Sequence, residues 1–236
     1  MPKILLTGGA GFIGGHVARR LAAEGFAVRA LVRSNSSTRA LAGTPVETVA
    51  GDLRDADSLR RAVQGCAGVF HVAADYRLWS RNPQELYDSN VQGTENLLRA
   101  AAEARVERFV YTGTVGVLRF TTDGRPATET DLASLDSLAG HYKRSKFLAE
   151  QVVLRYAADG FPVVIVSPSA PVGEADSKPT ETGKMVLDFM LGRMPAYVDT
   201  GLNLVDVRDV AEGHLDRKST RLNSSHVSES RMPSSA

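Results

Sequence analysis

A tyrosine and a lysine four positions apart, Tyr142 and Lys146, form the pair in this sequence best suited to acid–base chemistry. On a helix, side chains at this spacing leave the same face, so the lysine ammonium would lie beside the phenol. A phenol titrates at about pH 10 and is a poor base near neutrality, but an adjacent positive charge favours its phenolate. Tyr142 could then exchange a proton with a substrate hydroxyl or carbonyl. The same pair is also typical of a solvated helix face, so its meaning depends on the rest of the chain.

Three glycines, Gly8, Gly11 and Gly14, lie in the segment TGGAGFIG between an expected strand and an expected helix. A turn without side chains lets a diphosphate reach the backbone, where free amides and the partial positive charge of the helix start attract it. Glycines mark many tight turns, but the order strand, glycine turn, helix and second strand is typical of dinucleotide binding. We therefore predict a dinucleotide site at this turn.

The end of the second expected strand bears on which dinucleotide is bound. An acidic residue about twenty positions past the first glycines usually holds the ribose 2′-hydroxyl of NAD. This chain has Arg33 there and no acid, and an arginine can pair with the 2′-phosphate of NADP, so we predict NADP in preference to NAD. A solvated strand-end arginine is the alternative. Asp52 and Leu53 follow the third strand and could meet the adenine edge, although Asp52 could equally cap the next helix.

Two threonines end the fifth expected strand, in the sequence YTGT. The carboxyl edge of a parallel sheet is where ligands of open α/β folds bind. Thr114 could hydrogen-bond both the reacting substrate oxygen and the phenol. Thr112 competes for this role, and a plain turn residue is the alternative for Thr114.

Short β-branched or aliphatic runs alternate with longer segments of helical period, which is typical of βα units around a parallel sheet. We therefore expect an α/β fold, a Rossmann-type doubly wound parallel sheet with helices on both faces. The expected strands are residues 3–6, 26–32, 46–50, 68–72, 108–111 and 163–166, and the expected helices follow the glycine turn and span about residues 57–63, 83–104 and 141–158.

Composition restricts the function classes. The 28 Lys and Arg residues against 27 Asp and Glu leave a net charge of +1, so no whole-chain field favours nucleic acid or an acidic membrane. The only cysteine, Cys66, excludes an internal disulfide and a zinc site built on thiolates, and it suits a reducing, cytoplasmic location. None of His16, His71 and His141 has a second histidine or acid at ligand spacing, so we expect no metal site. The apolar run near the start is too short for a membrane span or a secretory segment.

We expect three regions along the chain. Residues 1–170 form the dinucleotide-binding domain, and residues 171–216, where the βα regularity fades, start a substrate-binding region. Residues 217–236 are expected to be a disordered tail, because from residue 218 onward seven of nineteen residues are serine and aliphatics are scarce. We interpret this tail as foreign sequence, since it resembles translated adaptor or vector and interrupts a helix just as the helix starts.

Together these residues resemble the extended short-chain dehydrogenase/reductase superfamily, the NAD-dependent epimerase/dehydratase family, whose members pair a TGxxGxxG loop with a Ser/Thr, Tyr, Lys triad. The resemblance runs from residue 3 to about residue 215. The stretches most similar to hopanoid-associated sugar epimerases and dihydroflavonol 4-reductases are FHVAADYRLW (70–79), NVQGT (90–94), HYKRSKF (141–147) and RMPAYVDTGLNLV (193–205).

The resemblance implies a bound NAD(P) and hydride transfer at a secondary alcohol or ketone of a small sugar-like or dihydroflavonol-like substrate. The implied catalytic residues are Thr114, Tyr142 and Lys146. The cofactor-binding residues that we assign from the loop, the strand ends and the resemblance are Gly8, Gly11, Phe12, Ile13, Gly14, Arg33, Asp52, Leu53, Ala73, Tyr142 and Lys146. Helix pairs such as 83–104 and 141–158 often form homodimer interfaces in this superfamily.

The chain departs from its expected relatives at several positions. Gly113 and Thr114 replace two serines, and Ser167 replaces an asparagine that is common in the group. Relatives also continue past Leu215, so we expect the C-terminal substrate domain to be largely missing. A non-catalytic NADP sensor and an inactive fragment of the enzyme are the alternatives to an active epimerase or reductase.

Overall fold

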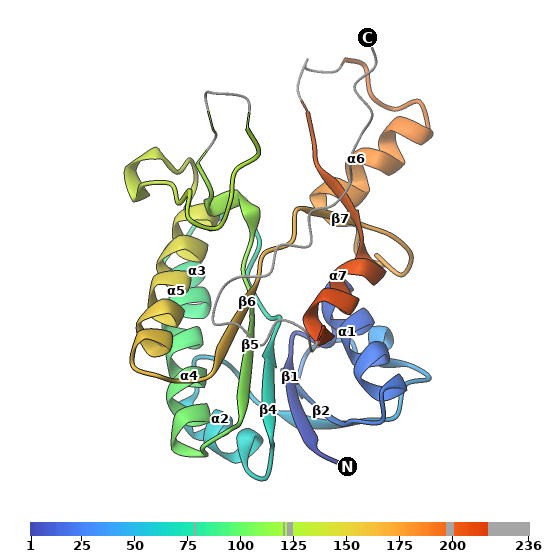
Figure 1. Cartoon of the computed structure of the whole chain (residues 1–236). Coiled ribbons are helices and arrows are strands. Elements are labelled where there is room, and N and C mark those ends of the chain that lie inside the picture. Colours follow the sequence, from blue (N-terminus) through green and yellow to red (C-terminus); the bar gives the residue numbers. More distant parts are fainter. Residues whose placement is uncertain (78, 120, 122–124, 197–200, 217–236) are drawn as a thin grey trace.

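The computed structural model of the chain describes residues 1–77, 79–119, 121, 125–196 and 201–216. Six strands form its main sheet: β1 (Lys3–Thr7), β2 (Ala27–Val32), β3 (Val46–Ala50), β4 (Gly68–His71), β5 (Arg108–Thr112) and β6 (Val163–Val166). They pair in parallel in the order β3-β2-β1-β4-β5-β6 (Figure 1). This order reverses between β1 and β4, the switch point where open α/β sheets bind ligands. The predicted Rossmann-type fold is confirmed.

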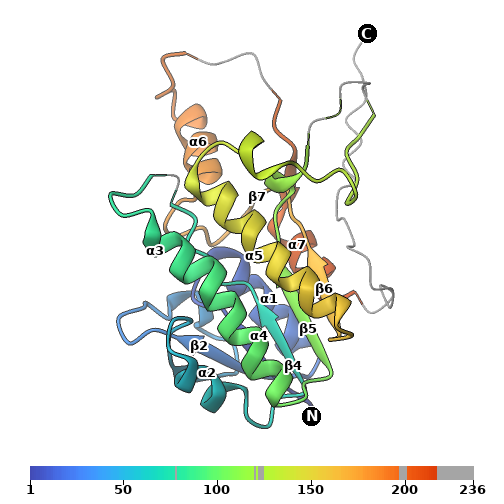
Figure 2. The ribbon, with the colours of Figure 1, turned by 90° about the vertical axis from the view of Figure 1, so that its left-hand side faces the viewer.

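Helices cover both faces of the sheet. On one face lie α1 (Phe12–Ala23) and α7 (Val207–Leu215), which pack against each other. The other face carries α2 (Ala56–Val63), α4 (Gly93–Glu103) and α5 (His141–Ala158), which lie side by side in Figure 2. Parallel strands need such crossover helices, and the helices in turn bury both faces of the strands.

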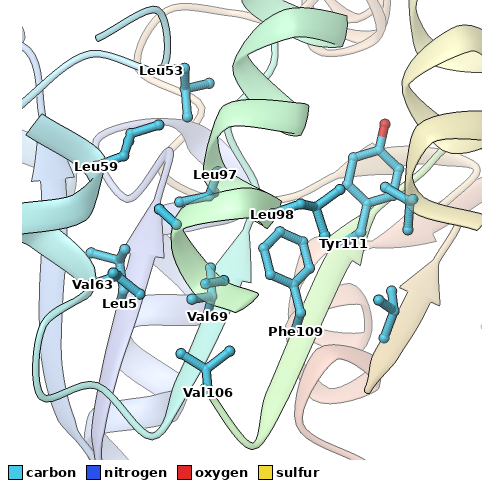
Figure 3. Packing of buried hydrophobic residues seen from close by; sticks show 14 of the residues in the cluster. Leu5, Leu53, Leu59, Val63, Val69, Leu97, Leu98, Val106, Phe109 and Tyr111 are labelled. Carbon is cyan, nitrogen blue, oxygen red and sulfur yellow. The ribbon is translucent and has the colours of Figure 1, made fainter. Parts of the chain in front are cut away.

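Two apolar clusters hold these layers together. The cluster under α2, α4 and α5 is shown in Figure 3 and includes Leu5, Leu97 and Phe109, none of which is exposed. The cluster under α1 is built around Leu6 and Leu21. Burying one such side chain contributes roughly 1.5–3 kcal/mol. The strand ends are therefore held on a rigid base, which is what a precise site requires.

The expected helix at residues 83–104 is not regular. It consists of α3 (Gln84–Tyr87), a π-helical turn (Asp88–Gln92) and α4. Asn90, in the π turn, is 3% exposed; its amide accepts from the Asp75 N–H (2.7 Å) and donates to the Asp75 carbonyl (2.8 Å) and to Ser145 Oγ (3.0 Å). The extra residue in the turn thus aims a polar side chain that joins the loop after β4 to α5.

A smaller parallel pair follows the main sheet, formed by β7 (Ala170–Val172) and β8 (Leu204–Asp206) with α6 (Glu181–Met190) between them. The sequence favours a weak helix around residues 184–191 and a short strand near residues 204–207, which agree with most of α6 and with β8, but it does not predict β7. No side chain of α6 is buried, and Phe189 and Met190 are 73% and 76% exposed. The serine-rich tail predicted for residues 217–236 lies outside the described residues, as do residues 197–200 of the last stretch of family resemblance.

Candidate active site

The glycines of the turn after β1 serve two different purposes. Gly8 has φ +75°, and a Cβ there would lie 2.6 Å from the backbone nitrogen of Ala73. A Cβ on Gly14 would lie 2.0 Å from the Gly8 carbonyl oxygen. Both glycines are therefore required by the packing of the chain on itself. At Gly11 a Cβ would meet only the Gly8 oxygen, at 3.2 Å. Gly11 is exposed, so the solvent-facing side of the turn is open there.

The start of α1 is suited to an anion. Gly11 occupies the N-cap position and supplies no side-chain acceptor, whereas Asp55 and Asp206 cap α2 and α7 through their carboxylates. The first amides of α1, which include those of Phe12 and Ile13, consequently lack the cap that the other two helices have. Free amides at a helix N-terminus and the helix dipole together attract phosphate.

A buried chain of hydrogen bonds ties the end of β1 to the end of β4. Thr7 Oγ1 and His71 Nδ1 are 2.8 Å apart, and His71 Nε2 and Thr94 Oγ1 are 2.9 Å apart. Because Thr94 donates its hydroxyl proton to the Asn90 carbonyl (2.6 Å), the Nε2 atom must be the donor and Nδ1 the acceptor. Burial lowers the pKa of His71 to about 3, so the ring is neutral. Thr7 Oγ1 also accepts from the Ala73 N–H (3.2 Å), which holds this predicted cofactor residue against Gly8.

Lys146 lies inside the protein at the end of β5. The residue is 4% exposed, and its ammonium donates to Tyr111 Oη (2.8 Å) and to the Thr112 carbonyl (2.7 Å). Figure 3 shows Tyr111 extending from β5 toward α5. Burial lowers the pKa of Lys146 to about 8. Two of its three ammonium protons are thus used by β5, and one remains for a ligand.

Tyr142 is half-buried on the same helix as Lys146, one turn earlier. Burial raises the pKa of the phenol, opposite to the effect expected from an adjacent positive charge. The Lys146 ammonium is hydrogen-bonded to Tyr111 and to the backbone of Thr112, and its charge does not offset this effect of burial.

The two candidate threonines of β5 have different surroundings. Thr112 Oγ1 lies 2.8 Å from Nε2 of His214, on α7, whose Nδ1 donates to the Val210 carbonyl (2.7 Å). The ring nitrogen facing Thr112 must therefore be an acceptor, and the Thr112 hydroxyl is used as its donor. Thr114 is half-buried in the turn after β5, where its Oγ1 accepts from the Gly116 N–H (3.1 Å). Its hydroxyl proton is not used in that bond, so Thr114 is the better placed of the two.

The remaining predicted cofactor residues lie at the ends of β2 and β3. Arg33 is exposed directly after β2, and its charge helps to lower the pKa values of Asp52 and Asp75. Asp52 pairs with Arg54 (2.8 Å), which lowers the pKa of Asp52 to about 2. The residue that caps the following helix, α2, is Asp55 and not Asp52. Leu53 is 8% exposed and belongs to the core cluster under α2.

Sequence reasoning missed several members of this region. Tyr111 and His214 hydrogen-bond to the candidate residues Lys146 and Thr112, and Asn90 hydrogen-bonds to Ser145, which directly precedes Lys146 on α5. The motif NVQGT contained Asn90, but no local pattern indicated its partners. Within the described ranges, no group of three or more His, Cys, Asp or Glu could hold a metal ion, and no helix is long and apolar enough to cross a membrane.

A doubly wound parallel sheet with a glycine turn at its first crossover and a Tyr–Lys pair on the helix before its last strand defines an extended short-chain dehydrogenase/reductase. The model of the NAD dependent epimerase/dehydratase family matches residues 4–216, and the chain belongs to this family. It is 50% identical over 210 residues to "Putative dihydroflavonol 4-reductase" of Synechocystis sp., covering 89% of this chain and 61% of that protein. It is 37% identical to sterol demethylase protein B of Methylococcus capsulatus, with 87% and 62% covered.

Among solved structures, gox2253 superposes with a TM-score of 0.86 and 49% identity, covering 91% of this chain and 65% of that one. The Thermus thermophilus UDP-glucose 4-epimerase complex with NAD superposes with a TM-score of 0.77 and 28% identity, covering 90% and 73%. The chain thus spans less than two thirds of the length of the curated relatives named here, at 61% and 62%.

Proposed function

We propose that this chain is the nucleotide-binding part of an NAD(P)-dependent epimerase or reductase, which transfers hydride at a secondary alcohol or ketone of a sugar-like or dihydroflavonol-like substrate. The observation that carries the proposal is the joint placement of Lys146 and the uncapped start of α1. The lysine lies at the carboxyl end of β5 and the helix start follows β1, at the same edge of one parallel sheet.

The residues present fit a dinucleotide. The open side of Gly11 admits a diphosphate to the amides of Phe12 and Ile13. Ala73, held against Gly8 at the switch point, lies where a dinucleotide would cross from one half of the sheet to the other. The third N–H of Lys146 would bind a ribose hydroxyl of the nicotinamide half. The fold of the Thermus thermophilus epimerase, which is described with NAD, supports this assignment.

The start of α1 and Lys146 would hold the dinucleotide, whose nicotinamide would supply or accept the hydride. Tyr142 moves the proton: its phenol donates to a carbonyl oxygen during reduction and accepts from a hydroxyl during oxidation. Thr114 donates its free hydroxyl proton to the same substrate oxygen. The Lys146 ammonium and the positive nicotinamide ring together would favour the phenolate and so would oppose the effect of burial, which raises the pKa of Tyr142.

Exposed Arg33 supports NADP as the preferred dinucleotide, because it lies directly after β2 and no acid replaces it. The proposed partners are this dinucleotide and a small-molecule substrate. A homodimer through α4 and α5, which pack side by side on one face, remains part of the proposal. The buried Cys66 thiol supports a cytoplasmic location, where thiols stay reduced.

The test combines binding with turnover. NADPH and NADH are titrated into the purified chain, and consumption of NADPH is followed with a panel of ketones and nucleotide sugars. The same assay is run on a chimera that continues past residue 216 with the remaining sequence of the Synechocystis relative. Tyr142→Phe should lower turnover about 10²- to 10⁴-fold and leave nucleotide affinity unchanged. Full activity of that variant would refute the role of Tyr142, and binding without turnover in both chains would favour a nucleotide sensor.

A further inference from the structure

Glu150 is a buried carboxylic acid that the proposed reaction does not use. It follows Lys146 by one turn of α5, so the two side chains leave neighbouring positions on one face of the helix. The residue is 7% exposed, and its Oε2 atom is enclosed without a hydrogen-bond partner in the described structure. A buried carboxylate is costly unless another charge compensates it.

The carboxylate occupies space at the end of β5. A Cβ on Gly113 would lie 3.1 Å from Glu150 Oε2 and 2.6 Å from Ser167 Oγ. The absence of a side chain at position 113 therefore leaves room for the acid. This gives a physical reason for a glycine at this position, where the family resemblance predicts serine.

Among the described residues, four titratable groups interact electrostatically with Glu150, either directly or through Lys146 and Tyr111. Tyr142 and Lys146 lie on α5, Tyr111 lies on β5 and His71 lies on β4. The two phenols have raised pKa values and the imidazole has a lowered one, so all three are neutral at pH 7. Lys146 is thus the positive charge that acts on Glu150 from within the protein.

We propose that Glu150 is a positioning residue for Lys146: its carboxylate is the internal counter-charge that keeps the lysine protonated, and the protonated lysine donates to Tyr111 and Thr112 at the end of β5. The hydrogen-bond acceptors of the ammonium, a phenol and a carbonyl, are both neutral and cannot offset the loss of water.

The protonation states at neutral pH agree with this role. Burial raises the pKa of Glu150 to about 6, while the charge of Lys146 acts in the opposite direction. Burial lowers the pKa of Lys146 to about 8, and the charge of Glu150 opposes that change. At pH 7 the acid is therefore mostly ionised and the lysine mostly protonated. Glu150→Gln should lower the pKa of Lys146 by about one unit or more.

The coupling can be measured without any nucleotide. The free energy of unfolding is measured against pH for the wild type, Glu150→Gln, Lys146→Met and the double variant. The unfolded chain binds more protons than the folded one above the folded pKa of Lys146, so its contribution makes stability rise with pH from about 8. In Glu150→Gln this rise should begin about one pH unit lower. It should be absent in both chains that carry Lys146→Met.

The reciprocal effect is expected on the acid. Because the folded pKa of Glu150 is raised, its contribution to stability is lost as pH rises from 4.5 through about 6. Lys146→Met should raise the folded pKa of Glu150 further and so extend this loss to higher pH, since coupling between two sites acts equally in both directions. This arm needs no substitution at Glu150 and so decides the proposal even if Glu150→Gln does not fold.

A second readout rests on the proposed function, because it uses NADPH binding. Fluorescence titrations from pH 6 to 9 should show affinity falling as Lys146 loses its proton, and in Glu150→Gln this fall should occur at lower pH. The variant should bind NADPH up to about tenfold more weakly than the wild type at pH 8 and equally well at pH 6.5. Glu150→Asp should restore the wild-type profile, and Asp136→Asn, at an exposed acid, should not change it.

The outcomes are distinguishable. If Glu150→Gln lowers stability and affinity equally at every pH, with all midpoints unchanged, Glu150 is only a packing residue and the proposal is overturned. If the wild type binds no NADPH, the proposed function fails, while the unfolding measurements still decide whether Glu150 and Lys146 are coupled.

Discussion

Substituting single glycines by alanine should separate the architectural part of the glycine turn from the part that meets the dinucleotide. At Gly14 the added Cβ would lie 2.0 Å from the Gly8 oxygen, and real Cβ contacts below 3.0 Å essentially never occur, so the backbone must move by about 1 Å. At Gly11 the only close atom, the same oxygen, is 3.2 Å away, and the backbone has the ordinary φ of −93°. The two variants add the same methyl group in very different surroundings.

The expected magnitudes follow from these contacts. Gly14→Ala overpacks a backbone-to-backbone contact and should lower the free energy of unfolding by about 1–3 kcal/mol or more. Gly11→Ala replaces an acceptable N-cap residue by a poor one and should cost about 1 kcal/mol or less. Its methyl group, however, would occupy the side of the turn that a diphosphate must approach, so NADPH affinity should fall at least about tenfold, equivalent to about 1.4 kcal/mol.

Urea unfolding of the two variants and the wild type measures the free energy of unfolding, and fluorescence titration measures the affinity for NADPH. Gly201→Ala serves as a matched control, because nothing lies within 4 Å of a Cβ at that position. Wild-type affinity in Gly11→Ala would contradict the diphosphate site at the start of α1. Wild-type stability in Gly14→Ala would contradict the close approach of Gly8 and Gly14.

Two further outcomes are expected. Arg33→Asp should shift nucleotide preference from NADPH toward NADH, whereas the same loss of charge on α4 in exposed Arg99→Glu should not; paired titrations with both nucleotides decide this. Burial lowers the pKa of His214 from 6.5 to about 4. Between these two pH values the unfolded chain binds more protons than the folded one, so the free energy of unfolding should fall by about 3 kcal/mol as pH drops from 6.5 toward 4. His214→Leu should make that fall shallower in urea unfolding series and should cost about 1–3 kcal/mol near pH 7, because the buried Thr112 hydroxyl loses its partner. An unchanged slope would show that the ring is not held neutral.

The main sheet was predictable because its signals are local. Each strand is a short apolar run and each crossover helix repeats its apolar residues with helical period, so residues 46–50 and 163–166 were assigned with the bounds that the structure has. β7 (Ala170–Val172) was missed because its sequence, Ala-Pro-Val, is three residues long and contains proline. The π-helical turn was missed because one extra residue in a helix leaves almost no trace in an apolar pattern.

The site was predictable only in part. The glycine turn and the pair Tyr142 and Lys146 stand out because their residues are close in sequence. Nothing local in the sequence indicates that burial raises the pKa of Tyr142. Nor does it indicate that Tyr111, 35 positions before Lys146, accepts a hydrogen bond from the ammonium. The hydrogen bond between Thr112 and His214 joins residues 102 positions apart.

Local sequence is thus sufficient for the types of the elements, the phosphate turn and the spacing of the acid–base pair, because each depends on residues within one or two turns of each other. Strand order and register decide which residues of different elements come into contact. They place Ala73 against Gly8, direct Lys146 to β5, and leave Glu150 buried beside Gly113. Charge and proton affinity in the site depend on these distant neighbours, since burial and opposite charge act through space and not along the chain.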